Sequence, residues 1–157
     1  MRIIAVDPGY GRMGVAVLEE KNRKPILLFS KCLTTPVGEF SSRLNQLVKN
    51  FSQLLGKWQP EALAIEKLYF TKNQKTAMRV AEVRGAIVAA AAGKELSIFE
   101  YTPLEVKVAV TGYGRADKKQ VAQMVPRLLD LKRAIKSDDE LDAIAVGLTA
   151  LASYRQS

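Results

Sequence analysis

The sequence predicts an α/β fold in which a mixed β-sheet is flanked by helices. Short continuous apolar runs, typical of strands covered on both faces, alternate with longer segments in which apolar residues recur every three or four positions, typical of helices. The order along the chain is β-β-β-α-β-α-β-α-α-α. The chain has 157 residues, 48% of them hydrophobic, and no repeats or linkers. We therefore expect residues 1–157 to form one domain with its own core.

The first three strands follow one another closely. We expect them at Arg2–Asp7, Met13–Leu18 and Ile26–Leu33, with a charged turn at Glu19–Lys24 between the second and the third. Short connections between successive strands predict an antiparallel meander.

The clearest helix follows this meander. Apolar residues recur with helical spacing from Phe40 to Trp58, and Pro60 ends the segment. We expect Gly93 to close the second helix as a C-terminal cap. The remaining elements are strands at Ala62–Glu66 and Ser97–Phe99, and helices at Asn73–Ala92, Pro103–Val110, Asp117–Leu131 and Asp138–Ser153.

The composition excludes several kinds of active site. The chain has no histidine and a single cysteine, which rules out a Ser-His-Asp triad, a His-ligated metal and an internal disulfide. Cys32 lies in an apolar run, so we expect it to pack as a small core residue. No apolar stretch approaches the roughly 20 residues that cross a membrane, and Asp7 comes too early for a signal peptide. A cytoplasmic location is therefore expected.

Charge is unevenly distributed along the chain. In total, 24 Lys and Arg stand against 16 Asp and Glu, a net charge of +8. Residues 66–133 hold 13 basic and 7 acidic side chains, whereas residues 134–157 hold 2 basic and 4 acidic ones. A basic surface favours a polyanionic partner, above all nucleic acid, although it also serves solubility. The acidic group near the C-terminus is the exception to this pattern.

Two of the predicted strands end in a carboxylate, Asp7 and Glu66. If these strands are adjacent and parallel, both acids lie at the sheet edge where α/β proteins bind ligands. On the last helix, Asp139 and Asp142 are i, i+3 neighbours. Helical periodicity alone does not decide between Asp138 and Asp139 as the residue that faces the site.

Each of these acids also has a structural interpretation. Asp7 precedes a Pro-Gly turn, which an aspartate can initiate. Ser137-x-x-Glu140 matches a capping box, and Asp138 and Asp139 would then suit the positive end of the helix dipole.

Taken together, converging acids in a basic protein indicate a cation site. Mg²⁺ prefers oxygen ligands and phosphates. Two such ions can act on opposite sides of a scissile phosphate, activating water and stabilising the leaving oxygen. This chemistry needs no histidine, which agrees with the composition.

Five short motifs resemble those of the RuvC-type Holliday junction resolvases, members of the ribonuclease H-like superfamily. They occur in the family's order from residue 1 to about residue 150. The motifs are Asp7-Pro8-Gly9 with Gly14; Ala64-Ile65-Glu66 followed by Phe70-x-Lys72-Asn73; Ala81-x-x-x-Gly85; Thr111-Gly112-x-Gly114 with Lys118; and Asp139-x-x-Asp142-Ala143-x-Ala145.

The resemblance implies a ribonuclease H-like, five-stranded mixed sheet, a homodimer, and Mg²⁺-dependent resolution of four-way DNA junctions by paired symmetric nicks. Two ions per site are implied, with Mn²⁺ as a substitute, and a branch-migration motor is a candidate partner. The catalytic and metal-binding carboxylates would be Asp7, Glu66, Asp139 and Asp142, which selects Asp139 over Asp138 by analogy. Some relatives place a histidine among these ligands, so the site of this chain is expected to contain oxygen ligands alone.

The resemblance also implies DNA contacts. Lys107 and Lys118 match phosphate-facing positions. Tyr69 stands where relatives often carry phenylalanine near the junction centre, and Phe70 follows it, so we expect one of them, Tyr69 by preference, to stack on an unpaired base. Further DNA-facing candidates are Lys72, Asn73, Lys75, Arg79, Arg84, Arg115 and Lys119.

Other interpretations are open on the sequence alone. The chain could cleave RNA or a different DNA structure, or bind junctions without cleaving them. The Asp-Pro-Gly loop and hairpin also resemble the phosphate loop of sugar kinases and actin, but those proteins need two such domains and a longer chain. A stripe of small residues on the second helix, from Ala77 to Ala89, fits either core packing or a dimer contact.

Overall fold

The computed structural model describes residues 1–68 and 73–154. Five strands form one mixed sheet in the order β3-β2-β1-β4-β5. β1, β2 and β3 are antiparallel neighbours, whereas β4 runs parallel to both β1 and β5. The predicted α/β fold and its opening meander are confirmed. The strands are β1 (Arg2–Asp7), β2 (Arg12–Lys21), β3 (Lys24–Thr34), β4 (Ala62–Glu66) and β5 (Ser97–Tyr101).

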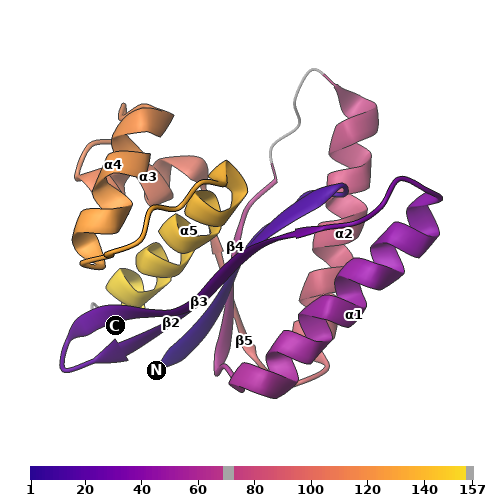
Figure 1. Ribbon diagram of the computed structural model, residues 1–157, viewed down its shortest axis with the longest axis horizontal. Helices are drawn as coiled ribbons and strands as arrows, with labels where there is room; N and C mark the ends of the chain where they lie inside the picture. The colour runs from indigo at the N-terminus through magenta and orange to yellow at the C-terminus, as the bar shows by residue number, and fades with distance from the viewer. Residues whose placement is uncertain (69–72, 155–157) are drawn as a thin grey trace.

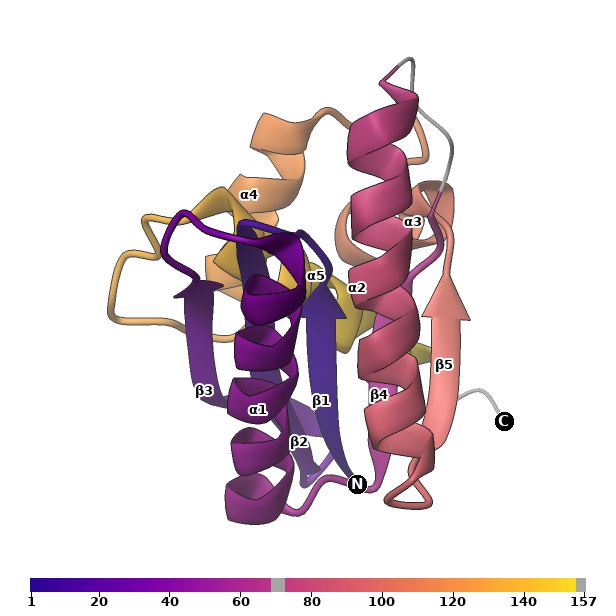
Figure 2. The same cartoon turned by 90° about the vertical axis from the view of Figure 1, so that its right-hand side faces the viewer.

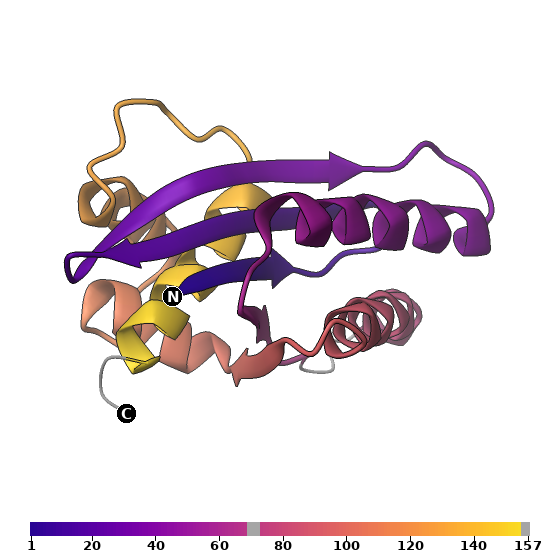
Figure 3. The ribbon, with the colours of Figure 1, turned by 90° about the horizontal axis from the view of Figure 1, so that it is seen from below.

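Helices cover both faces of this sheet (Figures 1 and 2). One face is covered by α1 (Phe40–Trp58) and α2 (Gln74–Ala92). The other is covered by α5 (Asp138–Tyr154), with α3 (Pro103–Thr111) and α4 (Lys118–Leu128) beside it. Figure 3 shows the same layers from below, with β2 and β3 running side by side along the molecule. No helix within the described ranges combines the length and apolarity that a bilayer crossing requires.

The central strand β1 divides its side chains between two cores. Ile3 and Ala5 belong to the core under α5, and Ile4 and Val6 to the core under α1 and α2. All four are fully buried. This explains the continuous apolar run, because successive residues of a strand point to opposite faces and both faces are covered here.

The β2–β3 hairpin is tighter than the predicted six-residue turn. β2 continues to Lys21 and β3 begins at Lys24, so only Asn22 and Arg23 form the turn. Both have positive φ angles, 53° and 61°, as two-residue hairpin turns require. The prediction of a longer turn was wrong because the charged residues Glu19–Lys21 and Lys24 belong to the paired ends of the two strands.

Two helix ends also differ from expectation. α4 ends at Leu128 rather than at Leu131, because the chain leaves the helix through a left-handed residue, Asp130 (φ 48°). α2 ends at Ala92 as predicted, but Gly93 has a φ of −64° and is not a left-handed cap. Glu95 adopts that conformation instead, with a φ of 60°.

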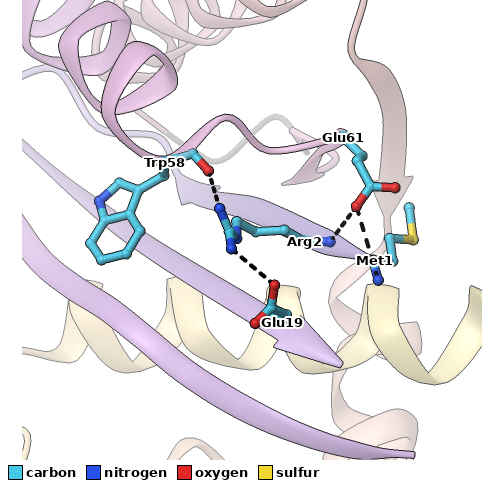
Figure 4. A network of polar contacts seen from close by, with 5 residues as sticks. All are labelled: Met1, Arg2, Glu19, Trp58 and Glu61. Atoms are coloured by element: carbon cyan, nitrogen blue, oxygen red, sulfur yellow. Dashed lines mark hydrogen bonds and ion pairs between the residues drawn. The ribbon is translucent and has the colours of Figure 1, made fainter. Parts of the chain in front are cut away.

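The end of the sheet where β1 begins is held by a polar network around Arg2 (Figure 4). The Arg2 guanidinium donates to the Trp58 carbonyl oxygen at 2.7 Å and to Glu19 Oε1 at 3.0 Å. The Arg2 backbone N–H donates to Glu61 Oε1 at 2.8 Å, and the N-terminal ammonium of Met1 lies 3.9 Å from the same oxygen. Opposite charges thus link β1 to β2 and to the segment that enters β4.

Candidate active site

Asp7 and Glu66 lie at one edge of the sheet, as predicted. β1 and β4 are parallel, with Val6 opposite Ile65. Each acid is the next residue and the last of its strand. The two carboxylates therefore come from adjacent strands at the same level of the sheet.

Close packing brings the first turn of α5 to this edge. A Cβ atom on Gly14 would lie 1.8 Å from the Asp139 carbonyl oxygen, and one on Gly147 would lie 2.4 Å from Leu18 Cδ1. A larger residue at Gly14 would push the backbone of α5 away from the sheet, and one at Gly147 would require Leu18 to move. Since Gly14 is also the β2 partner of Asp7, this contact sets α5 beside the end of β1.

The acids raise one another's proton affinity. Burial raises the pKa of Asp7 from 3.8 to about 8. The negative charges of Asp142, Asp139 and Glu66 contribute to this rise. Burial likewise raises the pKa values of Glu66 and Asp142. The negative charge of Asp142 raises the pKa of Glu66 further. A cation that bound here would relieve this repulsion.

The structure distinguishes the two acids between which the helical pattern did not decide. The Asp139 side chain is 23% exposed and acts on the pKa of Asp7. Asp138 is exposed and is not among the charges that raise the pKa of Asp7. Of this pair, Asp139 is therefore the residue whose charge acts on Asp7.

Two cations neutralise acids of the α5 turn. An Arg12 guanidinium nitrogen lies 2.7 Å from Asp139 Oδ2, and Lys118 Nζ lies 3.1 Å from Asp142 Oδ2. Both basic side chains are about two-thirds exposed. Over the described ranges, no three carboxylate or thiol side chains converge as ligands of a single metal ion. Instead, Arg12 pairs with Asp139 and Lys118 pairs with Asp142. These ion pairs partly offset the repulsion among the acids.

Two neighbours of Asp139 were missed or misplaced by the sequence interpretation. Arg12 follows the glycine-rich loop after Asp7 and was not singled out. Cys32 is not a core residue as predicted: it is half-buried, and its Sγ lies 3.8 Å from Asp139 Oδ2. The signal was its place on β3 opposite Gly14, which became visible only once the strand register was known.

A cavity of about 280 Å³ adjoins the acids on the α3 and α5 side. Glu66 and Asp142 line it together with Lys107 and Lys118. Lys107 also acts on Glu66, since its charge partly offsets the rise in the pKa of Glu66. The predicted lysines thus stand beside the predicted carboxylates, in a space open to a ligand.

The other predicted DNA-facing residues fall into two groups. Lys119 lies near Lys118, and Arg115 is exposed in the connection before α4. Lys75 and Arg79 lie on the first turns of α2, next to the opposite face of the sheet. Asn73 caps α2 through a hydrogen bond from the Thr76 backbone N–H at 3.2 Å. Tyr69, Phe70 and Lys72 lie outside the described residues.

Arg84 has a positioning role rather than the predicted DNA-facing one. Its side chain is 19% exposed and forms an ion pair with Glu100. Its Nε donates to the Glu66 carbonyl oxygen at 3.2 Å. Arg84 therefore anchors the end of β4 from which the Glu66 side chain projects.

The predicted capping box at the start of α5 is only half formed. The Glu140 backbone N–H donates to Ser137 Oγ at 3.4 Å. The Glu140 carboxylate accepts hydrogen bonds from Ser30 and Arg133. Because it joins α5 to β3 in this way, the helix start that carries Asp139 is fixed by tertiary contacts.

Comparison with known proteins assigns the chain to a family. Residues 3–150 match the family described as crossover junction endodeoxyribonuclease RuvC. This chain belongs to the RuvC family. A RuvC of Caldanaerobacter subterraneus is 43% identical over 149 residues, 94% of this chain and 90% of that relative. A RuvC of Thermosipho melanesiensis is 45% identical over 148 residues, 93% of this chain and 94% of that relative.

Solved structures agree with the RuvC assignment. RuvC of Thermus thermophilus in complex with a Holliday junction substrate superimposes with a TM-score of 0.92, at 30% identity over 99% of this chain and 96% of that one. The yeast mitochondrial Holliday junction resolvase, with a TM-score of 0.71 and 12% identity over 98% of this chain and 81% of that one, shares the fold. As a member of this family, the chain is an endodeoxyribonuclease that depends on a divalent metal ion.

Proposed function

We propose that this RuvC resolves four-way DNA junctions as a homodimer. Each protomer would hydrolyse one phosphodiester bond, at symmetry-related positions on two strands. Asp7, Glu66, Asp139 and Asp142 would hold two Mg²⁺ ions per site, with Mn²⁺ as a substitute. Residues 1–157 would act as a single nuclease domain.

One observation carries this proposal above the others. Burial and three carboxylates from β4 and α5 together raise the pKa of one half-buried aspartate, Asp7 of β1, to about 8. Next to them, a cavity offers the cations of Lys107 and Lys118. Acids for a metal ion and lysines for a phosphate, side by side, suit phosphodiester hydrolysis.

The chemical type of these donors suits divalent cations, and the ion pairs with Arg12 and Lys118 would have to open before Asp139 and Asp142 bind one. All four side chains offer oxygen ligands, which Mg²⁺ prefers, and their mutual repulsion favours an added positive charge. When bound, such ions supply Lewis-acid activation of water and stabilise the oxygen that leaves phosphorus. No histidine is present in the chain to act as a general base. Loss of a proton from the attacking water would therefore depend on the positive charge of the bound ions.

The chain's own residues would perform the other steps. Asp7, protonated at neutral pH when no cation is near, would release its proton as the site fills. Lys118 would exchange Asp142 for a phosphate oxygen of the substrate strand, as its exposed side chain permits. Lys107, which lines the same cavity as Glu66, would hold the scissile phosphate near the acids. Water would then attack phosphorus in line and lose a proton to solvent, and the opposite P–O bond would break as the leaving oxygen takes up a proton to become a hydroxyl.

The junction and its symmetry carry the remaining parts of the proposal. The related RuvC was solved with a Holliday junction substrate, and two equivalent sites in a twofold dimer suit two symmetric nicks. Tyr69, with Phe70 as the alternative, would stack on an unpaired base at the junction centre. A cytoplasmic location and a branch-migration motor as partner complete the proposal.

A cleavage assay tests this function. We expect the wild type to nick a four-way junction in Mg²⁺ at symmetric positions on two strands, read from labels on opposite strands, and to leave linear duplex DNA and duplex RNA intact. Without Mg²⁺, no product is expected. Cleavage of all three substrates alike would refute junction selectivity, and sedimentation as a monomer at assay concentrations would refute the dimer.

A further inference from the structure

A second cavity lies at the same end of the sheet, on the face covered by α1 and α2. It measures about 290 Å³. Figure 2 shows that the first turns of both helices lie at the end of the sheet to which β1 points. The lining residues are Tyr10, Gly38, Phe40, Arg43, Lys75, Thr76 and Arg79. Three of them are basic and none is acidic.

Arg43 is held in place without an acidic partner. Its Nε donates to Thr35 Oγ1 at 2.9 Å, and its guanidinium lies 5.2 Å from the centroid of the Tyr10 ring. The backbone of Gly11 also packs against it, because a Cβ atom there would lie 2.8 Å from Arg43 Nη2. Among the residues that the structure describes, no carboxylate forms an ion pair with Arg43.

Aromatic rings order a second cation of this cavity, Arg79. The Arg79 guanidinium lies 4.1 Å from the centroid of the Phe40 ring, and Phe40 meets Tyr10 edge to face at 6.3 Å. Arg79 also pairs with Glu82 at 3.1 Å, an exposed contact of small energy. Two guanidinium groups thus stand on a fixed aromatic pair, which lowers the entropy lost when they bind a ligand.

We propose that this cavity is a second phosphate-binding site, which holds the backbone of a DNA strand on the α1 and α2 side of the catalytic acids. The proposal rests on the proposed function and adds a subsite to it. Guanidinium groups match phosphate oxygens in shape and charge, and Lys75 adds an exposed cation at the rim. Tyr10 lies only three residues after Asp7, so the loop that leaves β1 leads from the acids to this cavity.

The two phosphate sites would flank the acids from opposite sides. Lys107 and Lys118 lie on the α3 and α4 side, and Arg43, Lys75 and Arg79 on the α1 and α2 side. A strand held on both sides has its scissile phosphate fixed between them. Because contacts to phosphate carry no base information, the site would affect binding of all sequences alike.

The salt dependence of binding tests this inference. Binding of a labelled four-way junction would be measured by fluorescence anisotropy from 50 to 300 mM salt, in Mg²⁺, with Asp7→Asn as the background that suppresses cleavage. Arg43→Gln and Lys75→Gln are each expected to weaken binding about 3- to 10-fold and to reduce the slope of log Kd against log salt by about 0.9, one phosphate contact. The matched control is Lys49→Gln, an exposed lysine of α1 outside the cavity, which should leave the slope unchanged.

Each outcome decides the question. Slopes for both cavity variants that equal the control would overturn the proposal. Because Lys75 is exposed, Lys75→Gln decides the question even if Arg43→Gln folds poorly. Saturable binding of inorganic phosphate that leaves junction affinity unchanged would assign the cavity to a free anion and also overturn the proposal. Failure of the proposed function is separate, since it would appear as absence of cleavage by the wild type while the slopes remain measurable.

Discussion

The two ends of β1 use charge in opposite ways. At its start, Arg2 is surrounded by Glu19, Glu61 and a carbonyl oxygen, so each charge has an opposite partner (Figure 4). At its end, Asp7 is half-buried, and its burial and the charges of three other carboxylates raise its pKa. The residues of β1 between Arg2 and Asp7 are all apolar and fully buried. The difference shows that one end stabilises the fold, whereas the other stores repulsion that a bound cation would relieve.

The largest expected effect concerns catalysis at the acidic end. Asp7→Asn should lower the rate of junction cleavage at least about 10³-fold, because it removes the anionic oxygen that Asp7 would offer to a divalent cation. Rates would be measured on gels under single-turnover conditions. The matched control is Asp130→Asn, an exposed residue with positive φ that asparagine accepts, and it should retain wild-type activity. Full cleavage by Asp7→Asn would exclude Asp7 from the catalytic site.

At the other end, loss of a charge should cost stability instead of activity. Arg2→Gln removes the ion pair with Glu19 and the hydrogen bond to the Trp58 carbonyl oxygen. We expect the free energy of unfolding to fall by about 1–2 kcal/mol, measured by urea denaturation. Cleavage at 25 °C should change less than twofold. A stability equal to that of the wild type would show that this network contributes nothing net.

Stability of the metal-free protein should fall as pH rises from about 4 to about 8. The folded state raises the pKa of Asp7 from 3.8 to about 8, so in this range it holds a proton that the unfolded chain has released. The unfolded state then binds fewer protons, and the free energy of unfolding decreases with pH. Asp7→Asn should flatten the profile and stabilise the protein at pH 8 by about 1–3 kcal/mol.

Thermal denaturation in EDTA at several pH values tests this sign. The wild type should melt at a lower temperature at pH 8 than at pH 5.5, and Asp7→Asn should reduce that gap. Arg2→Gln, at the paired end, should keep the wild-type difference between the two pH values. A larger gap in Asp7→Asn than in the wild type would contradict the raised pKa.

The smallest expected effect concerns Arg12, which forms an ion pair with Asp139. Arg12→Gln should raise the affinity for Mn²⁺ about 2- to 5-fold in the absence of DNA, since the metal no longer displaces an exposed ion pair. Isothermal titration calorimetry would measure it. Lys21→Gln, at the far end of the same strand, provides the same charge change away from the site. Equal affinities for the two variants would show that Arg12 does not compete with the metal.

Much of the fold followed from local patterns. The uninterrupted apolar run of β1 predicted a strand buried on both faces, and the helical spacing of α1 predicted its bounds, Phe40–Trp58. The predicted bounds were wrong where the backbone conformation of single residues ends an element. Examples are the two-residue turn at Asn22 and Arg23 and the early end of α4 at Leu128. Such endings depend on single φ angles, which side-chain patterns record poorly.

The acids of the candidate site were equally visible, but their partners were not. Strand ends and an i, i+3 pair were enough to single out Asp7, Glu66 and Asp142. Nothing in the helical pattern separated Asp139 from Asp138, whereas in the structure only the charge of Asp139 acts on Asp7. Arg12 was missed, and Cys32 was wrongly placed in the core, because their proximity to Asp139 arises from strand register.

The sequence by itself determined the type of chemistry available. Without histidine, and with a single cysteine, only carboxylates could form the metal site, and the basic middle third already favoured a polyanion. Tertiary structure alone decided that the acids raise the pKa of Asp7, that Arg12 and Lys118 neutralise two of them, and that Arg43 joins Tyr10 in a second basic cavity. The physical reason is that charge interactions and burial depend on distances between segments remote in the chain, whereas composition and periodicity are local.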